Sequence, residues 1–424
     1  MAVLAHEAAH LDGPTLDRAR LRSRIALFLG VAVGSTGYIA AVTVASIVAK
    51  DLLGDVTLAG VPSATVVLGA AAGAVLLSGI MARRGRRMGL TIGYLVAVLG
   101  ALVATLAVIV RSFPLLIVGT FLIGFGNSAN NLSRYAAADL VPTKRRPVAI
   151  GLVVWAATIG GVVGPWLVPL AQGVATGLGL PPLAGPYLVP VVFVAIAAAL
   201  SFILLRPDPF ALADESAARD EAPESRVPIR TILTRPIVLA AIVALVGGQA
   251  TMTLIMTMTP LHLTDHGHGL GTVGLVISGH VAGMFALAPV SGWLTQRFGS
   301  VRTIFLGAGV LMGASALAAL SPPESDTLLF VALFLLGFGW NLGFVAGSTL
   351  LSSGVSLAER ARVQGAADAV IWSTSAVASV GSSLVVAAAG YTTLGLLGVV
   401  IVIGPAALLL RRRNLIATAT AAAG

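Results

Sequence analysis

The sequence of 424 residues has no cysteine and few charged side chains. Without cysteine it has no disulfide, no thiolate metal site and no cysteine nucleophile. Charged residues make up 10% of the chain, whereas a soluble domain carries about 25%. Because 57% of the residues are hydrophobic, too little polar side chain is present to cover a globule in water. A lipid bilayer is therefore the expected surroundings of the chain.

Long apolar runs dominate what is present. A helix needs about 20 apolar residues to cross the hydrocarbon core, and twelve stretches reach that length. The sequence therefore predicts an all-α membrane protein. The expected spans are residues 25–49, 62–81, 89–110, 114–138, 147–171, 186–205, 236–262, 271–295, 303–321, 327–353, 364–388 and 391–410.

Basic residues give the expected orientation. Of the 26 Lys and Arg, 23 fall on one side of these spans, Lys50 and Arg111 fall on the other, and Arg134 lies within the fourth span. Because Lys- and Arg-rich loops stay in the cytoplasm, both termini are expected there. The basic loops thus indicate topology and not a nucleic-acid surface. The sequence has no nucleotide-binding loop and no nucleophile–base motif, so neither enzymatic activity nor a resident cofactor is expected.

The chain is expected to fold as two bundles. The predicted parts are a cytoplasmic tail (1–24), a six-helix bundle (25–205), a cytoplasmic linker (206–235), a second six-helix bundle (236–410) and a second cytoplasmic tail (411–424). Acidic residues, Asp208 among them, alternate with arginines in the linker. This pattern predicts a solvated segment.

The two halves resemble each other at an offset near 213 residues. Gly79–Gly85 matches Gly292–Gly299 after one deletion, and Gly124-Phe-Gly126 matches Gly337-Phe-Gly339. A repeat of this length indicates a transporter built from two pseudo-symmetric bundles, with the substrate site near the midplane.

The two glycine-rich turns resemble the G-x-L-x-D-R-x-G signature of the major facilitator superfamily. Arg83 and Gln296 replace the usual Asp of that signature, and we expect Asp139 to supply the missing carboxylate. The fifth span contains Gly160-xxx-Gly164-Pro165, which looks like the motif of proton-coupled antiporters in this superfamily. Small residues at this spacing are also typical of close helix packing.

Ionisable residues within spans are costly and usually functional. Arg134, Asp139 and Asp368 are candidates for ion coupling or for a gate. Arg134 and Asp139 lie about 140° apart around a helix, so they are not expected to pair along it. The alternative for both is snorkelling or pairing between helices. The alternative for Asp368 is a favourable position near a helix N-terminus.

Methionine and histidine form a second candidate site. Met252 and Met256 lie four residues apart in the seventh span, and so do His280 and Met284 in the eighth. Each pair therefore shares one helix face, and Met252 and His280 are each expected roughly 15 Å from the outer loop. If the faces converge, thioethers and an imidazole make a soft site suited to Cu(I). Core packing by methionine is the alternative, and His280 could instead bind an organic substrate or relay protons.

Three histidines near the outer end of the seventh span extend this hypothesis. His262, His266 and His268, with Met258, are candidates for a funnel that collects a metal ion. The alternative is an ordinary polar loop.

The methionine–histidine pattern resembles that of the CcoA-like copper importers, a branch of the major facilitator superfamily. The stretches Arg134–Asp139 and Gly339-Trp-Asn341 also resemble this branch. The resemblance implies copper uptake across the bacterial cytoplasmic membrane, with copper as the transported ion, and we expect a monomer. The branch also includes carriers of riboflavin.

A proton-coupled transporter of an organic molecule is the competing hypothesis, either a riboflavin-type importer or a multidrug exporter. The glycine motif of the fifth span and Asp368 favour it. Trp155, Trp340 and Trp372 are candidates to stack on a flat ring, or else they are packing and interfacial anchors.

Overall fold

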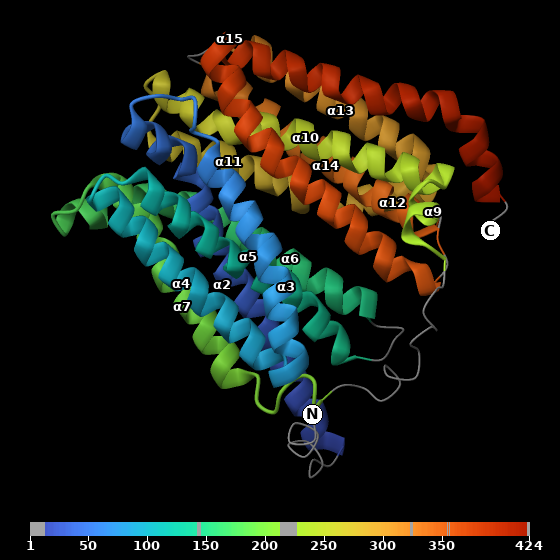
Figure 1. The fold of residues 1–424 in the computed structure, drawn as a ribbon, viewed down its shortest axis with the longest axis horizontal. Helices are drawn as coiled ribbons and strands as arrows, with labels where there is room; N and C mark the ends of the chain where they lie inside the picture. The colour runs from blue at the N-terminus through green and yellow to red at the C-terminus, as the bar shows by residue number, and fades with distance from the viewer. Residues whose placement is uncertain are drawn as a thin grey trace. The chain divides into compact units, whose positions relative to one another are not determined.

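A computed structural model of the chain describes residues 13–141, 146–212, 227–322, 325–353, 355 and 357–421 (Figure 1). Within these residues the regular structure is entirely helical. The chain divides into two compact units. Unit 1 comprises Met1–Gly54 and Val61–Glu221, and unit 2 comprises Asp55–Gly60 and Ala222–Gly424.

The helices of unit 1 follow the first six predicted spans. They are α2 (Gly13–Leu53), α3 (Val61–Arg84), α4 (Arg86–Ile109), α5 (Phe113–Asp139), α6 (Arg146–Gly177) and α7 (Gly185–Leu204), with the short 3₁₀ helix η2 (Pro182–Ala184) before α7. Helix α2 begins twelve residues before the apolar run that predicted it. The reason is that Arg, Leu and Ala are strong helix formers whether or not lipid surrounds them.

The helices of unit 2 account for the other spans. They are α9 (Ile229–Leu233), α10 (Pro236–Asp265), α11 (Leu270–Phe285), α12 (Ala288–Phe298), α13 (Ser300–Leu320), α14 (Asp326–Ser353) and α15 (Leu357–Ala421). Helices α11 and α12 together make the eighth span, which bends just before Pro289.

Helix α15 contains two spans in succession. The described residues include 11 candidate membrane helices, and the last of them covers 42 residues. That length is about 63 Å, roughly twice the thickness of the hydrocarbon core. The helix breaks at Gly390, whose φ is 78° and ψ 173°. The break divides it into the eleventh and twelfth predicted spans, and the twelve-span fold is confirmed.

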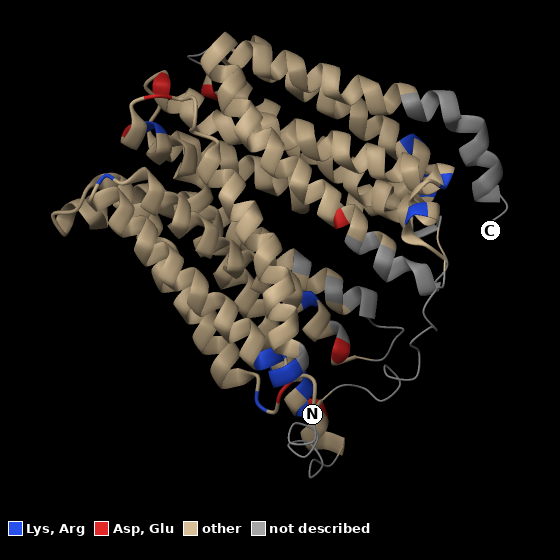
Figure 2. Cartoon of the chain, in the orientation of Figure 1, with Lys and Arg blue, Asp and Glu red and all other residues tan. Residues whose placement is uncertain are grey.

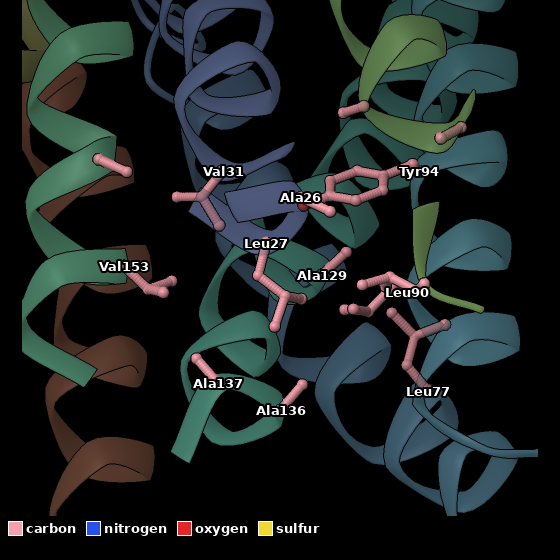
Figure 3. Packing of buried hydrophobic residues seen from close by; sticks show 14 of the residues in the cluster. Ala26, Leu27, Val31, Leu77, Leu90, Tyr94, Ala129, Ala136, Ala137 and Val153 are labelled. Atoms are coloured by element: carbon pink, nitrogen blue, oxygen red, sulfur yellow. The ribbon is translucent and has the colours of Figure 1, made fainter. Parts of the chain in front are cut away.

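The core of unit 1 is made of aliphatic side chains and many alanines. Leu27, Leu77, Leu90 and Val153 come from four different helices and belong to one buried cluster with Ala129 of α5 (Figure 3). Small residues allow helix backbones to approach closely. In lipid, which is as apolar as the side chains, helices associate through such close packing because the hydrophobic effect does not favour their contact. Charged residues of the described chain lie mostly near helix ends, so the middles of the helices are nearly free of charge (Figure 2).

Glycines mark the tightest helix contacts and repeat in both units. A Cβ on Gly124 would overlap the carbonyl oxygen of Val66 in α3, and one on Gly337 would overlap the carbonyl oxygen of His280 in α11. Two residues further on, Gly126 and Gly339 make equivalent close approaches to α4 and α13. The fourth span of each half is therefore packed in the same way against the second and third, as the sequence repeat predicts.

The turn glycines of the repeat also correspond. Gly85 precedes α4 with φ 88° and ψ 166°, and Gly299 precedes α13 with φ 85° and ψ 156°. Residues with a Cβ rarely adopt this backbone. In the fifth span, Gly160 and Gly164 both lie against the backbone of α2 around Thr36, so this motif does serve close packing.

The glycine contacts predict a selective loss of stability. Gly124→Ala places a methyl group against the backbone of α3, and overpacking of this kind costs about 1–3 kcal/mol. Gly309→Ala in α13 is the matched control, because a Cβ at that position meets nothing within 4 Å. Thermal melting of the purified protein in detergent should show a lower midpoint for Gly124→Ala alone. Equal midpoints for the two variants would contradict the packing described here.

Candidate functional site

The arginine-rich turn between α3 and α4 is held by Asp139. Arg86 Nε donates to Asp139 Oδ2 at 3.0 Å, and a second guanidinium nitrogen lies 2.9 Å from the same oxygen. The ion pair connects the start of α4 to the end of α5. Asp139 thus supplies a carboxylate to the turn, as the sequence predicts, and its partner is Arg86 and not Arg134.

A second carboxylate reaches the same turn from the predicted linker. Asp208 is only 2% exposed, and its two oxygens accept the backbone N–H groups of Arg86 at 3.1 Å and Arg87 at 2.9 Å. These are unsatisfied donors in the first turn of α4, so Asp208 caps this helix from 121 residues away. A Cβ on Gly85 would overlap the Asp208 carboxylate, so the glycine is needed for space as well as for its positive φ.

The residues around Asp208 are packed on unit 1. Leu205 and Leu212 are buried in its core, and Arg20 Nε donates to the carbonyl of Leu212 at 3.0 Å. Arg206 and Arg87 both lie over the ring of Phe202. The prediction of a solvated linker is therefore wrong for residues 206–212, because the capping carboxylate of Asp208 and the buried Leu212 bind this part to the bundle. Residues 213–226 lie outside the described chain.

Two other candidate ionisable groups lie within helices. The Arg134 guanidinium donates to the Tyr135 hydroxyl at 3.1 Å and lies 4.9 Å from the centre of its ring. Asp368 is half-buried and interacts with other residues. Because α15 begins at Leu357, Asp368 lies about three turns inside the helix. The alternative of a carboxylate beside a helix N-terminus is therefore wrong.

His280 is fully buried against α14. Its Nδ1 lies 2.8 Å from the carbonyl oxygen of Leu333, while Nε2 has no hydrogen-bond partner in the described chain. The position follows from the close approach of α11 to Gly337 of α14. No hydrogen bond within the described residues joins this imidazole to a methionine sulfur. The convergence of the two methionine–histidine faces stays a prediction.

The four methionines differ in burial. Met252 is 5% exposed and Met258 is fully buried, whereas Met256 and Met284 are half-buried. Met258 lies about 240° around α10 from Met252, so it belongs to a different face. Only Met252 and Met256 share the face that the sequence pattern proposes on this helix.

The outer histidines form an aromatic group. His262 stacks on Tyr391 with ring centres 4.1 Å apart and lies 4.4 Å from the ring of His266. His266 Nδ1 lies 2.8 Å from the carbonyl oxygen of His262, and His268 also has interactions. In the described part of the chain, no three His, Asp or Glu side chains gather so as to hold a metal ion. The role of these histidines as a metal funnel stays a prediction.

Gln249 is the centre of a polar cluster that the sequence did not indicate. Its Oε1 accepts the Trp340 Nε1–H at 2.8 Å, and its Nε2 donates to Ser375 Oγ at 2.6 Å and Thr253 Oγ1 at 3.3 Å. One buried amide therefore joins α10, α14 and α15, which lie side by side in unit 2 (Figure 1). The sequence signal that could have indicated this cluster was the single glutamine of the seventh predicted span, Gln249.

An aromatic group adjoins this amide. Trp340 stacks on Phe344 with ring centres 4.7 Å apart and an interplanar angle of 18°, and Phe285 meets Trp340 edge-on at 6.1 Å. Trp340 is 8% exposed, whereas Phe344 is 36% exposed. Trp155 and Trp372 are 48% and 41% exposed, so of the three candidate tryptophans only Trp340 is enclosed in a polar cluster.

Twelve spans in two repeated bundles, with polar groups concentrated inside a few helices, define a polytopic secondary transporter. The model of the Major Facilitator Superfamily matches residues 26–380 and 251–423. The chain belongs to this superfamily, and it is a multi-pass membrane protein.

Curated relatives cover most of the chain. The uncharacterised transporter YdeG of Bacillus subtilis is 37% identical over 86% of this chain and 86% of its own. YddS of the same bacterium, also uncharacterised, is 34% identical over 92% and 91%. The riboflavin transporter RfnT of Brucella anthropi is 29% identical over 89% and 92%.

Solved structures share the fold at low sequence identity. An inward-facing bacterial homologue of the human lysosomal transporter Spinster has a TM-score of 0.66 at 15% identity, covering 95% of this chain and 97% of its own. The human organic anion transporter MFSD10 has a TM-score of 0.60 at 16% identity, covering 92% and 99%. These likenesses concern the fold alone.

The Asp208 cap predicts a local opening when it is removed. Asp208→Ala leaves the first N–H groups of α4 without a partner, and loss of such a cap costs about 0.5–2 kcal/mol. Hydrogen exchange measured by mass spectrometry should rise in peptides containing Arg86 and Arg87. Asp51→Asn is the control, because Asp51 pairs with Arg111 in an exposed position. Unchanged exchange in Asp208→Ala would show that the cap contributes nothing.

Proposed function

We propose that this transporter carries a small organic molecule with a flat aromatic ring system, with riboflavin as the first candidate. The observation that carries the proposal is the Gln249 cluster, in which one buried amide fixes Trp340 beside a stacked and partly exposed Phe344. The similarity to the riboflavin transporter RfnT supports it. The proposal places the chain in the bacterial cytoplasmic membrane with both termini in the cytoplasm, as the basic loops predict.

The chemistry of the cluster suits a flat heterocycle. Phe344 is stacked on one side by Trp340 and is 36% exposed, which leaves ring surface for a planar ligand. Aromatic pairs add about 0.5–1.5 kcal/mol beyond the area they bury. Thr253 and Thr257 are half-buried on α10. Their hydroxyls bond within α10 and to serines of α15, and each hydroxyl oxygen can accept a further hydrogen bond from the polar edge of such a ring. Hydrogen bonds placed at a few positions fix orientation in an otherwise apolar site.

Ion coupling has a candidate in the same unit. Asp368 lies on α15 two turns before Ser375, the residue that binds Gln249. Carboxylates within membrane helices often form part of a proton pathway. In this proposal, protonation of Asp368 changes the charge on α15. The organic molecule acts on the same helix through the hydrogen bonds that join Trp340, Gln249 and Ser375, and both effects take part in alternating access.

Copper is the second candidate because of His280. The Nε2 atom of this fully buried imidazole has no hydrogen-bond partner in the described chain. A buried polar atom without a partner costs about 1–3 kcal/mol, and a soft metal ion bound to it would remove that cost. The candidate ligands are His280 and Met284 on α11 with Met252 and Met256 on α10. This function requires the two faces to converge during transport.

Riboflavin uptake tests the first function. Radiolabelled riboflavin should accumulate in riboflavin-auxotrophic cells that express the protein. Phe344→Leu should lower uptake about two- to tenfold through loss of stacking, while Phe344→Tyr should keep it. Trp293→Leu is the control, because Trp293 is an aromatic side chain of unit 2 that is 56% exposed and lies outside the Gln249 cluster. Membrane abundance of each variant is measured by immunoblot.

Two outcomes would count against this function. Uptake no greater than in vector controls removes riboflavin as the substrate. Equal uptake by Phe344→Leu and the wild type removes the aromatic site, even if riboflavin is carried.

Copper uptake tests the second function. If copper is the substrate, His280→Ala and Met252→Ala should each reduce radiolabelled copper uptake to the level of vector controls. Met312→Leu in α13 should leave it unchanged, because Met312 belongs neither to the candidate ligands nor to the candidate funnel. Loss of uptake in Met312→Leu to the same degree would point to a general packing effect and not to a metal site.

A further inference from the structure

Helix α5 carries an unusually polar segment inside the membrane. Residues 127–135 read Asn-Ser-Ala-Asn-Asn-Leu-Ser-Arg-Tyr. Part of this polarity is structural: Asn130 accepts the Tyr94 hydroxyl at 2.9 Å and donates to Ser35 Oγ at 3.2 Å. Ser128 donates to the carbonyl of Ala70 in α3, and Ser133 donates to a carbonyl of its own helix. These groups hold unit 1 together.

The other polar side chains of the segment share one face. Asn127, Asn131, Arg134 and Tyr135 fall within an arc of about 100° around the helix. Asn131 is exposed and Tyr135 is 44% exposed. Apart from the bond between Arg134 and Tyr135, the described part of the chain gives none of these side chains a hydrogen-bond partner. We call these four residues the α5 polar face.

Arg134 gives this face a positive charge without a counter-charge. No described carboxylate pairs with it, and the nearest acidic residue along α5, Asp139, pairs with Arg86. Its Nε atom is buried and has no hydrogen-bond partner. The Tyr135 ring and hydroxyl hold the guanidinium in place. Apart from the bond to Tyr135, the donors of Arg134 are therefore positioned but unused.

A face of this kind is not stable against lipid. Charged and carboxamide side chains in spans face the bundle interior or a water-filled cavity. We propose that the α5 polar face binds an anionic group, a carboxylate or a phosphate, carried by the transported molecule. The proposal rests on the function proposed above and goes beyond riboflavin, which carries neither a carboxylate nor a phosphate: among flat organic molecules, an anionic one is expected to bind more tightly than riboflavin.

The donors match that chemistry. A guanidinium binds carboxylate and phosphate through paired N–H groups, with a geometry that no other side chain offers. The amides of Asn127 and Asn131 add N–H donors one turn apart, and Tyr135 adds an O–H donor. An anion would satisfy the buried Arg134 donors and neutralise the charge in one step.

The lack of cysteine makes a direct test practical. Asn131→Cys introduces a single thiol about one helical turn from Arg134. The purified variant is reconstituted in phosphatidylcholine vesicles and treated with a sulfonate-bearing or a trimethylammonium-bearing methanethiosulfonate. We expect the anionic reagent to react about fivefold faster than the cationic one, relative to their rates with a free thiol. Adding Arg134→Gln should abolish the preference, and adding Arg134→Lys should keep it.

Val118→Cys is the matched control on the same helix. Val118 is 51% exposed, and residues 113–123 on either side of it along α5 carry no charge, so its thiol should not react with either charged reagent. The proposal is overturned if Asn131→Cys is equally unreactive, if the cationic reagent reacts faster, or if the preference is the same in Arg134→Gln. None of these outcomes depends on riboflavin uptake, so failure of the proposed function and failure of the anion site are distinguished.

Protection of the thiol identifies the source of the anion. Riboflavin 5′-phosphate should slow the modification of Asn131→Cys more than riboflavin does, and Arg134→Gln should remove that difference. If riboflavin protects the thiol as well as its 5′-phosphate does, the site does not recognise an anionic group and the proposal is overturned. Equal protection by inorganic phosphate, or by phosphatidylglycerol in the vesicles, would overturn its assignment to the transported molecule and assign the site to a free anion or a lipid headgroup.

Discussion

A polar group in the hydrocarbon core of a bilayer can bond only to other protein groups or to water in a cavity. Most polar side chains in the described spans obey this constraint by closing on one another. Asn130 with Tyr94 and Ser35, Asp208 on the first turn of α4, and Gln249 with Trp340 all join separate helices. Some groups of the described spans stay open, His280 Nε2, Tyr187 Oη and the α5 polar face among them, and such positions are able to accept a ligand.

Much of the fold could be predicted from the sequence because each span is long, apolar and bounded by arginine or glycine. The repeat was also readable, since Gly85 and Gly299 must adopt a positive φ and Gly124 and Gly337 must allow backbones to touch. Asp208 could not be found in this way. Its charge suggests a solvated linker, and only the folded chain brings it to the N–H groups of Arg86 and Arg87.

The candidate site was harder to predict than the fold, because spacing along one helix does not say which neighbour a face meets. The i,i+4 pattern of His280 and Met284 places them on one face, but that face lies against α14 at Gly337 and Leu333. Gln249 and Asn131 belong to no sequence motif. The role of Gln249 depends on Trp340, 91 positions away, and that of Asn131 depends on its having no hydrogen-bond partner in the described chain. A soft-metal site needs α10 and α11 to approach, whereas the aromatic cluster is already assembled in unit 2.

Transport by the purified protein tests the central claim, that the chain carries an organic molecule and not a metal ion. Proteoliposomes with an imposed proton gradient would be given radiolabelled riboflavin and radiolabelled Cu(I) in parallel, with protein-free vesicles as the control. The account predicts accumulation of the flavin above the control and copper at the control level. Copper accumulation without flavin accumulation would contradict it and would assign the function to the methionine–histidine residues.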